Sequence, residues 1–229
     1  MTARLTIAID GPSGSGKSSV SRAVARRLGL GYLDTGAMYR ALTWWCLDRG
    51  VDLTDEDAVA LAARELPLEI GTDPVTPTVR VGGRDVTQAI RTTEVSTAVS
   101  AVATNRNVRP ILQQLQRDLM ARIAEQTGGV VAEGRDITTV VAPDARVRVL
   151  LTASEDARLQ RRSAELHGTT DETAVAATRD QVVRRDRDDS TVATFTQAAE
   201  GVVLLDTSDL DFDASVEAVL DVVAAETAE

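Results

Sequence analysis

The chain has 229 residues, of which 43% are hydrophobic and 26% are charged, and these proportions exclude a largely disordered protein. Its formal net charge of −10 argues against general binding to nucleic acid or to an anionic membrane surface. A single cysteine, Cys46, and a single histidine, His167, exclude a disulfide framework and a zinc site built from several such residues.

The first thirty residues predict the opening of an α/β fold. Residues 5–10 are an apolar strand, and a glycine-rich turn follows. Residues 18–28 have helical spacing, with Val20 and Val24 on one face, and Gly29 ends the helix. Strand, glycine loop and helix in this order are typical of α/β proteins.

The remaining chain alternates between predicted strands and helices, with one interruption. We expect a strand at 32–34 and helices at 37–49 and 55–64, the second with Thr54 as N-cap. An antiparallel hairpin unit within 66–86 interrupts the pattern, and helices follow at 94–103 and 108–126. The last part of the chain predicts strands at 129–132, 147–151 and 202–205, a helix from the cap Ser154 to 166, a helix from 170 or 171 to about 189, and a helix from 213 onwards.

Residues 11–18 match the phosphate-loop pattern G-x-x-x-x-G-K-[ST], with a predicted strand before it and a predicted helix after it. Glycines let the backbone amides turn towards phosphate oxygens, and the helix dipole favours the same anion. The only lysine of the chain, Lys17, falls in this motif, where it would contact the β- and γ-phosphates, and the Ser18 hydroxyl would face Mg²⁺. A glycine-rich turn without a ligand does not account for so complete a match. We therefore expect the ATP-binding residues to be Gly11, Pro12, Ser13, Gly14, Ser15, Gly16, Lys17, Ser18 and Ser19.

The rest of the sequence favours a small kinase among phosphate-loop proteins. A GTPase needs an N-K-x-D motif, which is excluded because the only lysine is Lys17. The L-S-G-G-Q motif of transporter ATPases is absent, and the apolar run ending in an acid that motor ATPases carry has only weak matches at 131–133 and 204–206.

A kinase that acts on a phosphorylated acceptor needs several arginines around one cleft, because the guanidinium group matches phosphate geometry. Taken singly, each arginine of this chain could be a surface charge. Six of them lie in short, polar, turn-like settings: Arg40, Arg109, Arg135, Arg184, Arg185 and Arg187.

In these motifs and in the segments given below, the chain resembles the bacterial cytidylate kinases, a family of nucleoside monophosphate kinases. The two most specific segments are D-T-G-A-M-Y-R at 34–40 and E-G-R-D at 133–136, and the phosphate loop is shared with many other proteins. The matching stretches follow the family order across nearly the whole chain, at 9–18, 33–40, 86–109, 133–145 and 185–190.

The resemblance implies a single α/β kinase domain over 1–229, with a five-stranded parallel sheet flanked by helices. It further implies an acceptor-binding insert at 64–103 and a lid at 158–170. The implied reaction transfers the γ-phosphoryl group of ATP to CMP or dCMP, with Mg²⁺ as the cofactor.

Site residues carry over from the family motifs position by position. The cytosine-reading set would be Thr35, Ser100, Arg109 and Asp136; the acceptor-phosphate ligands would be Arg40 and Arg135; Asp189 would contact the ribose; and Tyr39 would line the acceptor cleft or pack in its helix. Lys17, Arg135 and Arg185 are the expected catalytic residues, with Arg185 on the transferring phosphoryl group.

Two departures from the family pattern bear on this expectation. Thr138 and Thr139 stand where the family carries G-T, and Val192 stands where it carries an arginine. The Pro-Leu that normally follows is replaced by 194–196, Thr-Phe-Thr. Our hypothesis is that Arg187 or Arg184 takes the place of the missing arginine.

Two other interpretations stay open from the sequence: a kinase for another small acceptor such as UMP or shikimate, and a catalytically impaired nucleotide-binding regulator, suggested by Val192. No apolar run approaches the roughly 18 residues of a membrane span, and the N-terminus lacks a signal-peptide pattern. We expect a cytoplasmic monomer whose partners are ATP and CMP or dCMP, with neither nucleic acid nor membrane.

Overall fold

The computed structural model describes residues 4–228. Its centre is a five-stranded sheet in the order β2-β6-β1-β7-β8, and every neighbouring pair of strands is parallel. The strands are β1 (Leu5–Asp10), β2 (Gly31–Asp34), β6 (Gly129–Gly134), β7 (Val147–Thr152) and β8 (Val203–Asp206). The predicted α/β class and parallel sheet are confirmed, and all five carboxyl ends meet at one edge of the sheet.

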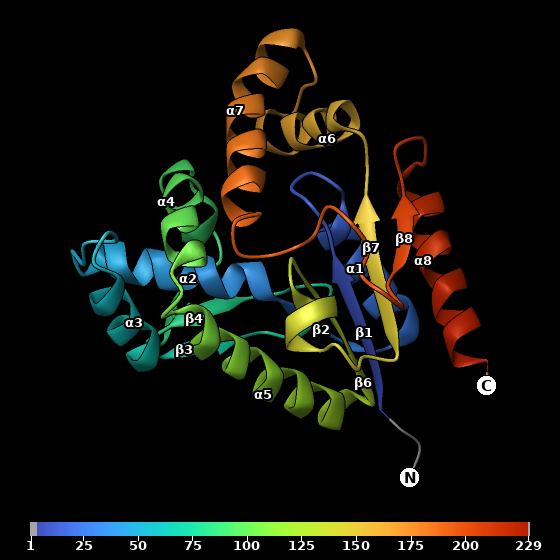
Figure 1. The fold of residues 1–229 in the computed structure, drawn as a ribbon, viewed down its shortest axis with the longest axis horizontal. Helices are drawn as coiled ribbons and strands as arrows, with labels where there is room; N and C mark the ends of the chain where they lie inside the picture. The colour runs from blue at the N-terminus through green and yellow to red at the C-terminus, as the bar shows by residue number, and fades with distance from the viewer. Residues whose placement is uncertain (1–3, 229) are drawn as a thin grey trace.

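Helices cover both faces of this sheet because side chains alternate along its strands. Ile7 and Ile9 of β1 pack on one face with α1 (Lys17–Leu28) and α8 (Phe212–Thr227). Ala8, between them, faces the other side and belongs to the cluster of α5 (Arg109–Thr127). Figure 1 shows α8 and α5 at these separate positions around the sheet.

The interruption predicted within 66–86 is a separate antiparallel sheet with the strand order β3-β4-β5. In the sequence this small sheet follows α2 and α3 and precedes α4. Val79, Val81 and Ile90 pack against α2. The elements are α2 (Thr35–Asp48), α3 (Glu56–Glu65), β3 (Leu68–Ile70), β4 (Val79–Val81), β5 (Arg84–Asp85), a short 3₁₀ turn at Ala89–Arg91 and α4 (Thr93–Thr104).

Two further helices, α6 (Glu155–His167) and α7 (Glu172–Asp189), lie against each other above the carboxyl edge of the main sheet (Figure 1). Gly168 ends α6 in the left-handed conformation, and Asp171 caps α7 by accepting from the Ala174 amide. We call these two helices the helical hairpin. They bring Arg158 and Arg161 of α6 and Asp186 of α7 into contact with the phosphate loop. Between residues 4 and 228, no helix combines the length and apolar character of a membrane span.

The structure corrects two local expectations. The cap of α3 is Asp55, whose carboxylate accepts from the Ala58 amide, whereas Thr54 is bound to Asp52. The β-branched run Ile137–Val141 forms one π-helical turn that was not predicted. A carboxylate at Asp55 caps a helix at least as well as a hydroxyl, and the π turn depends on a tertiary contact described below.

Candidate active site

The phosphate loop between β1 and α1 requires glycine at three positions. Gly14 and Gly16 have φ values of 76° and 86°, in the left-handed region. At Gly11 a Cβ atom would lie 2.2 Å from the carbonyl oxygen of Leu151. No side chain caps α1 at Gly16, so the first amides of this helix are left for an anion.

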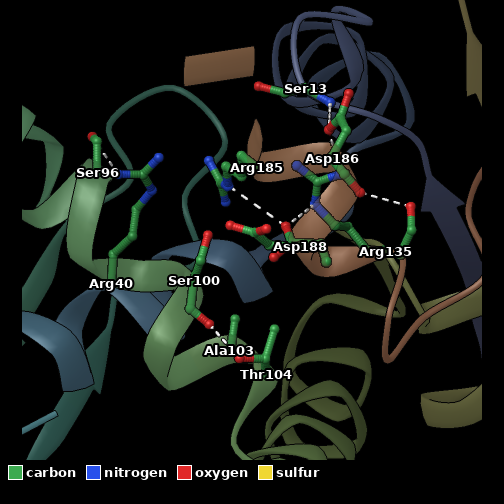
Figure 2. A network of polar contacts seen from close by, with 12 residues as sticks. Ser13, Arg40, Ser96, Ser100, Ala103, Thr104, Arg135, Arg185, Asp186 and Asp188 are labelled. Atoms are coloured by element: carbon green, nitrogen blue, oxygen red, sulfur yellow. Dashed lines mark hydrogen bonds and ion pairs between the residues drawn. The ribbon is translucent and has the colours of Figure 1, made fainter. Parts of the chain in front are cut away.

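A cavity, which we call the main cavity, opens beside this loop at the carboxyl edge of the sheet. Most of the predicted site residues line it. They come from elements far apart in the sequence: Ser13, Gly14, Gly16, Lys17, Ser18, Ser19, Thr35, Tyr39, Arg40, Arg109, Arg135, Asp136, Arg185 and Asp189. Four predicted residues do not line it: Gly11, Pro12, Ser15 and Ser100. Gly11 packs on Leu151 instead. In Figure 2 the Ser100 side chain on α4 is nevertheless directed towards the space between Arg40 and Arg185.

The main cavity also contains charged residues that sequence reasoning did not assign to it: Asp34, Arg91, Glu133, Arg162 and Glu165. Asp34 and Glu133 had a usable signal, since each lies at the carboxyl end of a predicted strand, where ligands bind in open α/β sheets. Arg91 lies in the stretch 86–109 that matches the family, but no role was expected for it, and Arg162 is one of several charges on its predicted helix with nothing local to distinguish it.

Glu133, at the end of β6, contacts Ser18 of the phosphate-loop motif. It is buried and accepts hydrogen bonds from the Ser18 hydroxyl, at 2.8 Å, and from the Tyr32 hydroxyl. Burial raises the pKa of Glu133 to about 7, and Lys17 opposes this shift. Burial lowers the pKa of Lys17 while Glu133 raises it again. A hydroxyl and carboxylates grouped in this way are the oxygen donors that Mg²⁺ prefers.

Asp10, at the end of β1, explains the π-helical turn. Its buried carboxylate accepts from the amides of Ile137 and Thr138, at 3.0 and 2.8 Å, and from the Thr138 hydroxyl at 2.6 Å. Burial raises the pKa of Asp10 to about 6, against these hydrogen bonds. Thr138, one of the departures from the family pattern, is thus anchored to β1, and the turn that follows Asp136 is held in place.

Several arginines line the main cavity together with the phosphate loop. Arg40 donates to the Ser96 hydroxyl at 2.8 Å and to the Ile90 carbonyl at 3.3 Å. Burial lowers the pKa of Arg40 to about 9, and nearby Arg185 contributes to the same shift. Burial also lowers the pKa of Arg185 to about 10. Both groups stay charged at neutral pH, so the protein holds repelling cations together, as a site for a multiply charged anion requires.

Figure 2 shows Arg40 on one side of this space, Arg135 on the other and Arg185 between them. Arg135 is held at three points. Its Nη1 lies 2.8 Å from Asp186 Oδ1, its Nε lies 2.7 Å from Asp189 Oδ2, and its guanidinium carbon lies 4.4 Å from the centre of the Phe195 ring. Phe195, in the segment that departs from the family pattern, therefore stacks on a predicted catalytic arginine.

Asp136, which lines the main cavity, is a carboxylate held by two side-chain donors. Asp136 accepts from Arg109 Nη2 at 2.6 Å and from the Gln113 amide at 2.8 Å. Thr35 lies close by in the cavity lining and donates its hydroxyl hydrogen to the Glu133 carbonyl at 2.7 Å. The Thr35 oxygen is therefore available only as an acceptor.

A second cavity adjoins the other side of the phosphate loop. It shares Gly14, Gly16, Ser19, Arg162 and Glu165 with the first, and its apolar wall is formed by Val20, Leu210 and Phe212. Arg162 is paired with Glu165 at 2.7 Å and lines both cavities. By contrast, Arg184 and Arg187 are exposed and line neither cavity, so their positions lend no support to the hypothesis that one of them replaces the missing arginine.

Comparison with known proteins agrees with the geometry. The chain matches the cytidylate kinase family over residues 7–225. It is 50% identical over 218 residues to a cytidylate kinase of Streptomyces avermitilis, covering 95% of this chain and 91% of the relative. It is also 50% identical over 223 residues to one of Cutibacterium acnes, covering 97% of each. A solved structure of an uncharacterized protein from Eubacterium ventriosum shares the fold alone, with a TM-score of 0.50, 11% identity and coverage of 96% of this chain and 99% of that one. A phosphate loop, a converging set of arginines and this similarity along almost the entire sequence place the chain in the cytidylate kinase family.

Proposed function

We propose that this protein transfers the γ-phosphoryl group of ATP to CMP and dCMP, giving CDP or dCDP and ADP. One observation carries the proposal: Lys17 of the phosphate loop faces the same cavity as Arg40, Arg135, Arg185 and the Arg109–Asp136 pair. A triphosphate and a monophosphate nucleotide bound there would have their phosphates side by side.

The carboxylate of Asp136 favours cytosine over uracil. Cytosine presents an amino donor at N4, which a carboxylate and the acceptor-only oxygen of Thr35 can bind, whereas uracil presents a carbonyl oxygen there. Arg109, paired with Asp136, would donate to the ring oxygen or nitrogen. Together with Ser100, these are the proposed cytosine contacts, and they disfavour UMP as the acceptor.

The acceptor phosphate and ribose would occupy the centre of the main cavity. Arg40 and Arg135 would hold the phosphate, and Tyr39 would form part of the wall. Asp189 Oδ1 is buried and has no hydrogen-bond partner within residues 4–228. It would accept from a ribose hydroxyl, which satisfies an atom that is otherwise costly to bury.

On the donor side, the residues of the phosphate loop would surround the β- and γ-phosphates. The adenine base would enter the second cavity, where Phe212 and Leu210 offer an apolar surface. Arg162, shared by both cavities, lies at their junction and would contact the transferring phosphoryl group together with Arg185.

The oxygen atoms of Ser18, Glu133 and Asp34 fit a magnesium ion, which they would hold directly or through water. When bound, the ion neutralises charge on the β- and γ-phosphates. Glu133 is suited to this role because its neighbour Ser18 already orients it.

Catalysis by this site needs positioning and charge stabilisation rather than a strong base, because a monophosphate acceptor is already anionic. Lys17, Arg162 and Arg185 would stabilise the phosphoryl oxygens during transfer. We further propose that residues 64–103 form the acceptor insert and that the segment 158–170, in the helical hairpin, acts as a lid that excludes water.

A coupled assay for ADP formation with CMP, dCMP, UMP, AMP and GMP as acceptors tests the proposed function. We expect turnover with CMP and dCMP, far weaker turnover with the others, and loss of turnover when EDTA removes divalent cations. Binding of ATP without turnover on any acceptor would instead favour a nucleotide-binding regulator.

Replacing Asp136 by alanine is expected to raise KM for CMP by about 10- to 100-fold, because this is the change in affinity that corresponds to the free energy of a hydrogen bond to a charged group. KM for ATP should change by less than about threefold, because Asp136 lies at the acceptor end of the cavity. Asp144→Ala, at an exposed position on a nearby turn, is the matched control and should change neither constant. Equal increases in both constants would contradict the assignment of Asp136 to cytosine.

A further inference from the structure

Asp186, on α7, lines neither cavity, yet it makes contacts that connect the helical hairpin with the site. Its Oδ1 accepts from the backbone amide of Ser13 at 3.0 Å and from Arg135 Nη1 at 2.8 Å. Its Oδ2 accepts from Arg158 Nη1 of α6 at 2.5 Å. One carboxylate thus joins α7, α6, the phosphate loop and the residue that follows β6. Figure 2 shows Ser13, Asp186 and Arg135 together.

The contact between the hairpin and the loop is reinforced by Arg158. The same Nη1 atom that binds Asp186 donates to the Ser13 carbonyl at 2.8 Å. A Cβ atom at Gly14 would lie 2.4 Å from the Arg158 carbonyl oxygen, so the backbone of α6 rests directly on the loop. The hairpin is therefore seated on the loop by paired polar contacts at Ser13 and by close packing at Gly14.

The Asp186 carboxylate is only 13% exposed. Burial favours its neutral form, but Arg135, the Ser13 amide and Arg158 together keep the pKa of Asp186 below its ordinary value. It therefore stays ionised, with both oxygens used as acceptors. An asparagine in its place would offer one acceptor oxygen and present an NH₂ group to one of the two arginines.

The position of Asp186 on α7 matters for two predicted site residues. Arg185 precedes it, and Asp189 follows one helical turn later. Arg135 lies between the carboxylates of Asp186 and Asp189, with the Phe195 ring against it. A small rotation of α7 would therefore displace Arg185 and Arg135 together.

We propose that Asp186 is a positioning residue for phosphoryl transfer, which seats the helical hairpin on the phosphate loop and thereby places Arg135 and Arg185 on the transferring group. The inference rests on the proposed function. Asp186 acts through the two arginines and through the loop, without itself contacting a nucleotide.

Loss of this contact has a consequence that simple destabilisation does not have. A loosely seated hairpin admits water to the γ-phosphate and misplaces the acceptor, so ATP hydrolysis without transfer rises relative to transfer. A smaller folded fraction would instead lower both rates by the same factor and leave their ratio unchanged.

The test compares Asp186→Asn with Asp188→Asn in the full-length protein. Both variants remove one negative charge from α7, but Asp188 makes its ion pair, at 3.7 Å, with the surface residue Arg187. For Asp186→Asn we expect kcat with CMP to fall by about 10- to 100-fold, the cost of misplacing reacting groups by roughly 1 Å. KM for ATP and CMP should change much less, and the number of ATP molecules hydrolysed per CMP phosphorylated should rise. Asp188→Asn should match the wild type in all of these.

Arg158→Gln is a second variant, which removes the contact from the α6 side and should raise the same ratio if Asp186→Asn fails to fold. The double variant should lose little more than the more impaired single variant, because both act through one contact. The proposal is overturned if Asp186→Asn behaves like Asp188→Asn, or if hydrolysis and transfer fall by equal factors. Absence of CMP phosphorylation by the wild type would refute the proposed function instead.

Discussion

Lys17→Met is expected to lower the rate of phosphoryl transfer by about 10³-fold or more, the cost of removing a charge aimed at the developing transition state in a buried site. Lys17 is the only lysine of the chain, begins α1 and lines the main cavity beside Glu133. Methionine has a similar length and no charge, so the loop should keep its shape. The effect should appear in kcat with CMP, measured with both substrates saturating.

The matched control for this variant is Arg26→Met, which removes a positive charge from the exposed side of the same helix. It should leave kcat unchanged, and both variants should show wild-type circular dichroism and a similar melting temperature. Turnover within tenfold of the wild type in Lys17→Met would contradict the role of this side chain at the donor phosphates.

Arg185→Ala is expected to have an effect of comparable size, about 10³-fold on kcat, as for other arginines that stabilise a transferring phosphoryl group. Arg185 lies between Arg40 and Arg135 (Figure 2), and its Nε lies 3.6 Å from Asp189 Oδ2. Because burial lowers its pKa only to about 10, it enters the reaction as a cation. Transition-state stabilisation predicts a loss in kcat with little change in KM for ATP.

Arg184→Ala and Arg187→Ala are the controls for Arg185, since these neighbours on α7 are exposed. Neither should change kcat or KM for CMP. A large loss in either would revive the hypothesis that one of them replaces the arginine missing at Val192. A loss confined to KM for CMP in Arg185→Ala would assign this residue to acceptor binding instead of phosphoryl stabilisation.

Local chemistry explains why so much of the fold followed from the sequence. β1, α1 and the glycine loop were predictable because apolar runs, helical spacing and positive-φ glycines each act over a few residues. The same holds for the hairpin unit around Gly82 and Gly83, whose φ values of 58° and 78° form a tight turn. The one wrong cap, Thr54 for Asp55, is an error of one position between two acceptable capping residues.

Elements stabilised across the sheet were beyond local prediction. The π-helical turn at Ile137–Val141 exists because Asp10, over 120 residues earlier, accepts from its first amides. Glu133 could be placed at the end of a predicted strand, but its hydrogen bonds from Ser18 and Tyr32 depend on the tertiary structure. Arg162 had no signal at all, since only the seating of α6 on the phosphate loop brings it to the junction of the two cavities.

The sequence by itself therefore determined the α/β class and the phosphate loop, because these depend on short motifs and on apolar periodicity, whereas most of the other expected site residues came from the resemblance to the cytidylate kinases. Only the tertiary structure decided which polar and charged groups contact one another. Asp186 accepts from the Ser13 amide and from Arg135, and Arg185 lies between Arg40 and Arg135. Such contacts depend on distances of a few ångströms between residues far apart in the chain, 173 positions for Ser13 and Asp186, and no local pattern encodes these distances.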